Sequence, residues 1–178
     1  VRDTFERLER EHGGPDILVN NAVIRNNDRG ERGPFLKLEL EAWRAYMARN
    51  LEALFLVTQL AARGMARRRR GCILNISSNG AVRPHRQNLA YDALKGALES
   101  FTRALAVDLA PWNVRVNALR PCAVADAPEP GTEQARVQAR LGAMVPLGRI
   151  ARPEDVGWAA AFLASDRAAY ITGQILSL

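Results

Sequence analysis

Apolar and polar residues alternate along this chain with two different periods. Val1, Phe5 and Leu8 recur at helical spacing, and Gly13 and Gly14 then end the segment. Residues 16–22, with the sequence DILVNNA, form a short apolar run bounded by turn residues, which predicts a buried strand. The first part of the chain is therefore predicted to be a helix followed by a strand.

The same order recurs further along the chain. The pattern predicts a helix over residues 39–69, a strand from residue 72, a helix over residues 90–109 and a strand from residue 114. A loop-rich stretch over residues 122–147 follows, then a helix that Pro153 opens and a last apolar segment, YITGQILSL. This alternation predicts an α/β fold with right-handed crossovers, in which one domain over residues 1–178 has a parallel sheet covered on both faces.

One polar residue interrupts the apolar stripe of the long helix. Asn50 follows Met47 at the i+3 position, and the stripe continues through Leu51 and Leu54. A buried amide needs hydrogen-bond partners. Asn50 therefore either bonds to a neighbouring segment or organises a water molecule or a helix distortion at a site.

The composition is that of a globular domain, with 48% hydrophobic and 25% charged residues among 178. The sequence has no run of eighteen apolar residues, and its first residues lack the apolar region of a signal peptide. Neither membrane insertion nor export is indicated. The expected compartment is the cytoplasm.

The net charge of +6 and the run ARRRRG at residues 66–71 raise the question of an acidic partner. The run lies at the end of the long helix, where arginines complement the negative end of the helix dipole and Gly71 would serve as the cap. We therefore expect a solvated helix end, with no nucleic acid and no membrane as partner.

Cysteines and histidines are few. Cys72 and Cys122 lie in apolar sequence without metal-ligand spacing, which predicts two buried thiols. With only His12 and His85 besides, no metal site is expected.

The segment AYDALKGAL, residues 90–98, places Tyr91 and Lys95 four residues apart among good helix formers. Positions i and i+4 are neighbours on a helix, and a cation beside a phenol favours the phenolate. The pair is a candidate proton-transfer device. The alternative is an amphipathic helix with a packed tyrosine and a solvated lysine.

Several motifs, in this order and spacing, resemble the short-chain dehydrogenase/reductase family. Ser78 precedes Tyr91 by thirteen residues, and Lys95 follows. The resemblance covers nearly the whole chain and rests on DILVNNA, Asn50 within its apolar helix, ILNISS, the Tyr91 and Lys95 pair, VRVNALRP and the segment from PLGRIARPEDVGW to the C-terminus.

The resemblance implies a Rossmann-like doubly wound parallel sheet and an NAD- or NADP-dependent oxidoreductase that interconverts a secondary alcohol and a ketone. Tyr91 would exchange the proton while hydride passes to or from the nicotinamide. Lys95 would support Tyr91 and hold the nicotinamide ribose. Ser78 would donate a hydrogen bond to the substrate oxygen, with Ser77 as its rival, and Asn50 would support a proton-relaying water.

The resemblance also implies cofactor contacts by Tyr91 and Lys95 and by five further residues at the ends of the predicted strands: Asn20, Asn21, Ala22, Pro121 and Val124. The residues that choose between NAD and NADP lie outside this pattern. The substrate, a small alcohol or carbonyl compound, is not identified by the residues after Pro121. A homo-oligomer formed through the long helix and the Tyr91 helix is expected of the complete form.

The family's glycine-rich turn has no counterpart among the 13 glycines, so we expect an N-terminally truncated sheet. The strand with Ile17, Leu18 and Val19 would then be an open edge. The 178-residue chain is accordingly expected to self-associate and to bind NAD(P) weakly, and a non-catalytic remnant is the alternative to an enzyme. Three substitutions also depart from the family pattern near the cofactor: Val23, Cys122 and Asp126.

Overall fold

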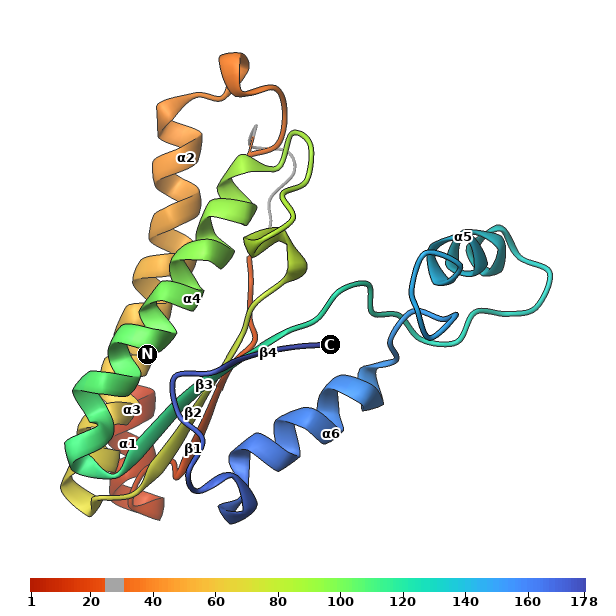
Figure 1. The fold of residues 1–178 in the computed structure, drawn as a ribbon. Coiled ribbons are helices and arrows are strands. Elements are labelled where there is room, and N and C mark those ends of the chain that lie inside the picture. The colour runs from red at the N-terminus through yellow and green to blue at the C-terminus, as the bar shows by residue number, and fades with distance from the viewer. Residues whose placement is uncertain (25–30) are drawn as a thin grey trace.

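The computed structural model describes residues 1–24 and 31–178, which build a four-stranded parallel sheet with helices on both faces (Figure 1). The strand order is β1-β2-β3-β4, and Ile73 lies between Leu18 and Val116 in the register. The strands are β1 (Ile17–Asn20), β2 (Gly71–Ile76), β3 (Val114–Arg120) and β4 (Ile175–Ser177). The predicted α/β class is confirmed.

Except for α5, the helices lie close to their predicted places. They are α1 (Arg2–His12), α2 (Leu40–Met47), α3 (Ala53–Arg68), α4 (Leu89–Leu109), α5 (Glu133–Gly142) and α6 (Pro153–Ala164). Gly13 ends α1 in the left-handed conformation, with φ 73°, as the sequence predicts. No helix among the described residues has both the length and the apolar character needed to cross a membrane.

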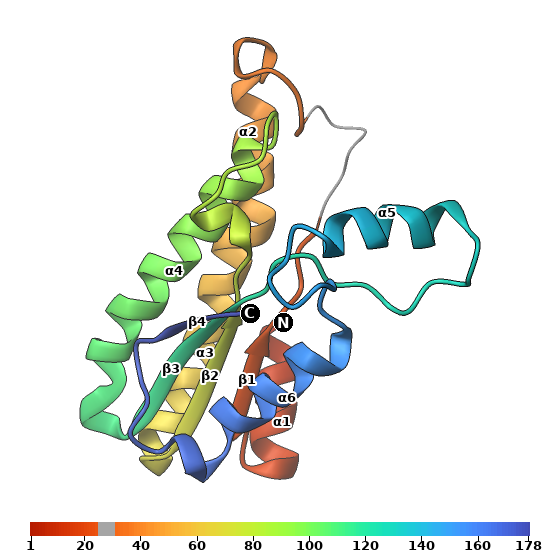
Figure 2. The same ribbon diagram turned by 45° about the vertical axis from the view of Figure 1, so that its right-hand side comes forward.

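Two apolar clusters hold these helices to the sheet. Alternate residues of a strand point to opposite faces, so Ile73 packs with α3 and α4, and Leu74 packs with α6. Figure 2 shows α6 on one side of the sheet, with α3 and α4 on the other. The first cluster includes Ala61, Met65, Ala106 and Val116, and the second includes Leu119, Leu163 and Ala168.

The third crossover differs from the prediction. The strand order advances in one direction from β1 to β4, and the first two connections pass through α3 and α4 on the same face. The connection from β3 to β4 passes through α6 on the opposite face, so it is left-handed, whereas the first two are right-handed (Figure 2). The prediction of right-handed crossovers throughout is therefore wrong for this last unit.

The stretch predicted to be loop-rich contains α5, which lies away from the sheet in Figure 1. The Thr132 hydroxyl caps the helix by accepting the Ala135 N–H at 3.2 Å. Its residues are mostly strong helix formers, but Val137 and Leu141 are 45% and 38% exposed. The helix therefore follows local propensity and capping, and its apolar stripe is weak, because Val137 and Leu141 are its only large apolar residues.

Helix α6 begins as predicted, with Pro153 in its first turn. The Asp155 carboxylate accepts hydrogen bonds from the Arg149 guanidinium, at 2.6 and 3.0 Å, and from the Arg152 N–H at 2.7 Å. These contacts, the Arg149 hydrogen bonds foremost, lower the pKa of Asp155 to about 2. The start of α6 is thus held by an ionised carboxylate over the whole neutral pH range.

The arginine run at the end of α3 does not end as the sequence suggests. Arg69 is the residue that takes the left-handed cap conformation, with φ 53°, and Gly71 is already the first residue of β2. A Cβ on Gly71 would lie 2.5 Å from the Met65 side chain. Gly71 is therefore needed for this close approach, and the prediction that it caps the helix is wrong.

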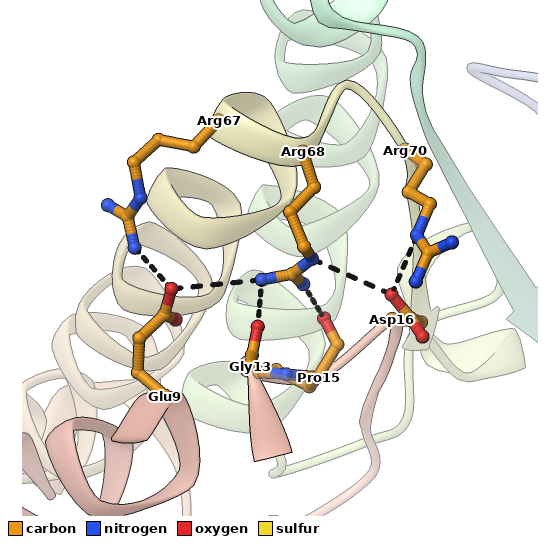
Figure 3. A network of polar contacts seen from close by, with 7 residues as sticks. All are labelled: Glu9, Gly13, Pro15, Asp16, Arg67, Arg68 and Arg70. Atoms are coloured by element: carbon orange, nitrogen blue, oxygen red, sulfur yellow. Dashed lines mark hydrogen bonds and ion pairs between the residues drawn. The ribbon is translucent and has the colours of Figure 1, made fainter. Parts of the chain in front are cut away.

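The arginines also join α3 to the segment between α1 and β1 (Figure 3). Arg67 bonds to Glu9 at 2.6 Å, and Arg68 donates to the carbonyl oxygens of Gly13 and, at 2.7 Å, Pro15. The guanidinium of Arg70 lies 3.3 Å from Asp16. A solvated helix end is thus an incomplete description, because the run fixes the entry to the first strand.

Strand β1 lies at an edge of the sheet that the described residues form. Ile17 and Val19 are 49% and 48% exposed, whereas Leu18 packs against the cluster under α3 and α4. Two of the three residues expected on an open edge are therefore exposed.

We expect Arg68→Ala to lower the free energy of unfolding by about 1–3 kcal/mol, because two backbone carbonyls lose a charged donor. Arg70→Ala is the matched control: its side chain is 68% exposed, against 22% for Arg68, and the loss should stay below about 0.5 kcal/mol. Urea denaturation of both variants measures the difference. Equal losses would contradict the role given to Arg68.

Candidate active site

The carboxyl ends of β1, β2 and β3 meet at one edge of the sheet. Asn20 ends β1, Ser78 follows β2 by two residues, and Pro121 directly follows β3. The Asn79 N–H donates to the Pro121 carbonyl at 3.0 Å, which joins the segments after β2 and β3. This edge is where open α/β sheets bind ligands.

Ser77 and Ser78 have different environments. Ser77 is 4% exposed, and its hydroxyl donates to Glu99 Oε1 at 2.7 Å. Ser78 is partly exposed, and its Oγ accepts the Gly80 N–H at 3.3 Å, so its own hydrogen remains available for donation. Of the two, Ser78 is the hydroxyl suited to meet a ligand.

Tyr91 and Lys95 lie at the start of α4, on one face. Lys95 is only 3% exposed, and its Nζ donates to the Ile76 carbonyl at 2.6 Å. The same Nζ lies 5.7 Å from the centroid of the Tyr91 ring. The alternative of a solvated lysine is therefore wrong, because this ammonium is buried against the end of β2 and beside the phenol ring.

Asn50 satisfies both interpretations that the sequence left open. Its amide accepts the Ile24 N–H at 2.8 Å and donates to the carbonyls of Ile24 and Tyr46, each at 3.0 Å. The helix is also distorted here, because residues Ala48–Glu52 form a π-helical segment between α2 and α3. Asn50 thus holds the chain after β1 against an irregular turn of the long helix.

The remaining predicted cofactor contacts are divided between two places. Asn21 and Ala22 line, with Asn50, a cavity of about 230 Å³ at the carboxyl end of β1. Val124 pairs with Ala151 in an isolated bridge, and no described contact joins it to Tyr91 or Lys95. The predicted residues at the ends of β1, β2 and β3 therefore lie at one edge of the sheet, whereas Val124 lies in the segment after β3, where it pairs with Ala151.

The two thiols differ. Cys72 is buried as predicted, and burial raises its pKa despite the nearby Arg115. Cys122 is exposed, so that prediction is wrong, because its segment leaves the sheet directly after Pro121. No group of three or more potential metal-binding side chains occurs within residues 1–24 and 31–178.

A chain of buried polar side chains, not foreseen from the sequence, lies beneath this edge. Asn20 Nδ2 donates to Thr58 Oγ1 at 3.0 Å and to Asn75 Oδ1 at 2.8 Å. Asn75 in turn donates to Thr102 Oγ1 at 2.9 Å. The signal was present, because Asn75 interrupts an apolar strand just as Asn50 interrupts an apolar helix.

A buried ion pair supports the serine segment. Glu99 lies one helical turn after Lys95 and accepts two hydrogen bonds from Arg120, at 2.7 and 2.6 Å, besides that from Ser77. Burial would raise the pKa of Glu99, but the hydrogen bonds from Arg120 and Ser77 and the charges of Arg120 and Arg103 outweigh it. The pKa of Glu99 is therefore lowered, and the carboxylate is ionised near neutral pH.

Comparisons with known proteins agree with this fold. The family model described as Enoyl-(Acyl carrier protein) reductase matches residues 1–178. The chain is 33% identical over 180 residues to 3-oxoacyl-(acyl-carrier-protein) reductase FabG of Thermotoga maritima, covering 100% of this chain and 70% of that protein. It is 36% identical over 178 residues to cis-4-hydroxycyclohexanecarboxylate dehydrogenase of Sinomonas cyclohexanicum, with 100% and 70% covered.

Solved structures give the same result. The crystal structure of acetoin dehydrogenase YohF from Salmonella typhimurium matches with a TM-score of 0.81 and 32% identity, over 98% of this chain and 66% of that one. The chain belongs to the short-chain dehydrogenase/reductase family, a class of NAD(P)-dependent oxidoreductases with a Rossmann-like fold. It spans about 70% of the length of the curated relatives.

The lowered pKa of Glu99 predicts a specific loss of stability in acid. A carboxylate with a lowered folded-state pKa stabilises the fold above its unfolded value, here 4.5, and this contribution disappears as the pH falls through the folded pKa. We therefore expect Glu99→Gln to lower the free energy of unfolding at pH 7, with a difference from the parent that shrinks below pH 4.5.

The control is Glu133→Gln, whose side chain is 77% exposed and which should change stability little at either pH. Chemical denaturation of the parent and both variants between pH 7 and pH 3 measures the differences. A Glu99→Gln difference that does not change with pH would show that the carboxylate charge is not what stabilises this cluster.

Proposed function

We propose that the site interconverts a secondary alcohol and a ketone, with Tyr91 as the acid/base group. The observation that carries this proposal is the buried ammonium of Lys95, 3% exposed and 5.7 Å from the centre of the Tyr91 ring. Burying a cation beside a phenol is costly for packing alone, but it stabilises a phenolate. The arrangement therefore suits proton exchange by the phenol.

Each side chain has a distinct role in this proposal. Tyr91 gives a proton to the ketone oxygen or takes one from the alcohol, and Lys95 stabilises the phenolate that results. Ser78 donates its hydroxyl hydrogen to the same substrate oxygen and so orients the carbonyl. The nicotinamide ring, when bound, supplies or accepts the hydride.

The donors at this edge fit a nicotinamide riboside. An ammonium, a phenol and a hydroxyl lie close together, and an ammonium is a donor that suits ribose hydroxyls. We infer that Lys95 holds the ribose and that Asn21, Ala22, Pro121 and Val124 contribute to the cofactor surface. The two amide hydrogens of Asn20 are already bonded to Thr58 and Asn75, so Asn20 acts by fixing the strand end. These residues do not distinguish NAD from NADP.

We infer that Asn50 supports the proton path through a bound water. Both of its amide hydrogens bond to backbone carbonyls, and its Oδ1 accepts one N–H, which leaves a second lone pair on that oxygen. Asn50 also lies within a π-helical segment, a distortion that is frequent at functional sites. Both features suit an ordered water beside the site.

The names of relatives support a small alcohol or carbonyl substrate. A 3-oxoacyl group contains a ketone, and the relative from Mediterraneibacter gnavus, 36% identical over 178 residues, is named 3alpha-hydroxysteroid dehydrogenase, which acts on a secondary alcohol. We further infer a homo-oligomer formed through α3 and α4, where Phe55 is 53% exposed and lines an apolar groove together with Phe101 and Leu105.

Replacing Tyr91 by Phe tests the acid/base role. The ring remains but the exchangeable proton is lost, so kcat should fall by about 10²–10⁴ while cofactor affinity changes little. Steady-state kinetics and cofactor titration by fluorescence measure the two quantities. A Tyr91→Phe variant with undiminished kcat would overturn the proposal.

Replacing Lys95 by Arg keeps the charge but puts a wide planar fork where a compact ammonium is buried. The guanidinium does not fit between the Ile76 carbonyl and the phenol ring, so both kcat and cofactor affinity should fall. Lys37→Arg, at an exposed position, is the matched control and should change neither. If the two variants behave alike, Lys95 has no special role.

A further inference from the structure

The loop between Ser78 and α4 is fastened to the helix by two side chains that the proposed reaction does not use. Asp92, in the first turn of α4, is only 8% exposed. Its Oδ2 accepts the His85 N–H at 2.6 Å, and its Oδ1 lies 2.8 Å from His85 Nδ1. One carboxylate therefore holds both the backbone and the ring of His85.

The ring of His85 has a defined hydrogen position. A carboxylate accepts hydrogen bonds and does not donate them, so Nδ1 of His85 carries the hydrogen that points to Asp92. The ring side chain is 51% exposed, and its centroid lies 6.2 Å from that of Tyr91. We call the paired side chains the Asp92–His85 clamp.

The clamp packs directly against the turn that orients Ser78. Gly80 donates its N–H to Ser78 Oγ, and a Cβ at Gly80 would lie 2.2 Å from Asp92 Oδ1 and 3.0 Å from the His85 ring. The backbone of the Ser78 turn therefore fits against both members of the clamp, with no room for a side chain between them. On the other side, Asp92 directly follows Tyr91 in α4.

We propose that Asp92 and His85 are positioning residues that set the place of the Ser78 hydroxyl relative to the Tyr91 phenol. The clamp joins the loop after β2 to the helix that bears Tyr91, so both groups belong to one rigid unit. This proposal rests on the proposed function for the identity of the reacting groups. Its geometric part is independent of the reaction.

Two isosteric replacements at His85 separate this role from direct contact with substrate. The amide nitrogen of Asn takes the place of Nδ1, whereas that of Gln takes the place of Nε2. If the bond to Asp92 is what matters, His85→Gln should lower kcat by about tenfold, the effect of one charge-assisted hydrogen bond, and His85→Asn should recover most of it. Asp92→Ala removes both acceptor oxygens and should lower kcat at least as much as His85→Gln, with cofactor affinity unchanged in all three variants.

A readout without substrate tests the geometric part. Hydrogen exchange of the peptide spanning residues 78–85 should be faster in Asp92→Ala and His85→Gln than in the parent, and close to the parent in His85→Asn. Nitrogen NMR of the imidazoles should show a protonated Nδ1 at His85. Because the chain has two histidines, His12→Gln assigns the signals and is the control for exchange.

The outcomes separate the two proposals. A parent protein that turns over no secondary alcohol or ketone would end the proposed function, and exchange and NMR would still decide on the clamp. Unchanged exchange in Asp92→Ala, which lacks both acceptor oxygens, would overturn the clamp whatever the kinetics. Activity kept by His85→Gln and lost by His85→Asn would also overturn it, since Nε2 would then be the group that matters.

Discussion

The site depends on one hydrogen bond, that from the buried ammonium of Lys95 to the Ile76 carbonyl. A charged group is tolerated in a protein interior only when it is paired or hydrogen-bonded, so this contact, together with the bonds from Asn75 to Thr102 and from Ser77 to Glu99, fixes where α4 lies along β2. Ser78 is two residues beyond Ile76, and Tyr91 is one helical turn before Lys95. This hydrogen bond therefore positions two groups: the Ser78 hydroxyl, which follows β2, and the Tyr91 phenol, which belongs to α4.

Buried polar side chains extend this constraint across the sheet. Asn20, Asn75 and Thr102 form a continuous chain of hydrogen bonds from β1 through β2 to α4. Apolar packing against Ile73 or Leu74 fixes how closely the layers approach but not their position along the strands, whereas hydrogen bonds fix both. The polar chain thus keeps the strand ends level at the edge where the candidate site lies.

The order of strands and helices could be predicted because apolar period is a local property of the sequence. The four catalytic candidates followed from a resemblance, and the bond from Lys95 to Ile76 was not foreseen, because it joins residues that only the fold brings together. The same reason applies to the left-handed connection around α6 and to the exposure of Cys122. Helix α5 was not predicted although its capping and its helix propensity are local properties. The prediction depended on an apolar stripe, and that of α5 is weak.

The π-helical turn Ala48–Glu52 has a consequence for how the long helix can vary. Such a turn accommodates one residue more than a regular helix, and each residue of an α-helix advances about 100° around its axis. Removing a single residue here would restore a regular helix and leave the face of α2 that bears Trp43 and Tyr46 in nearly the same orientation relative to α3. The π-helical turn therefore lets this segment hold one additional residue without changing the phase between the two halves of the helix.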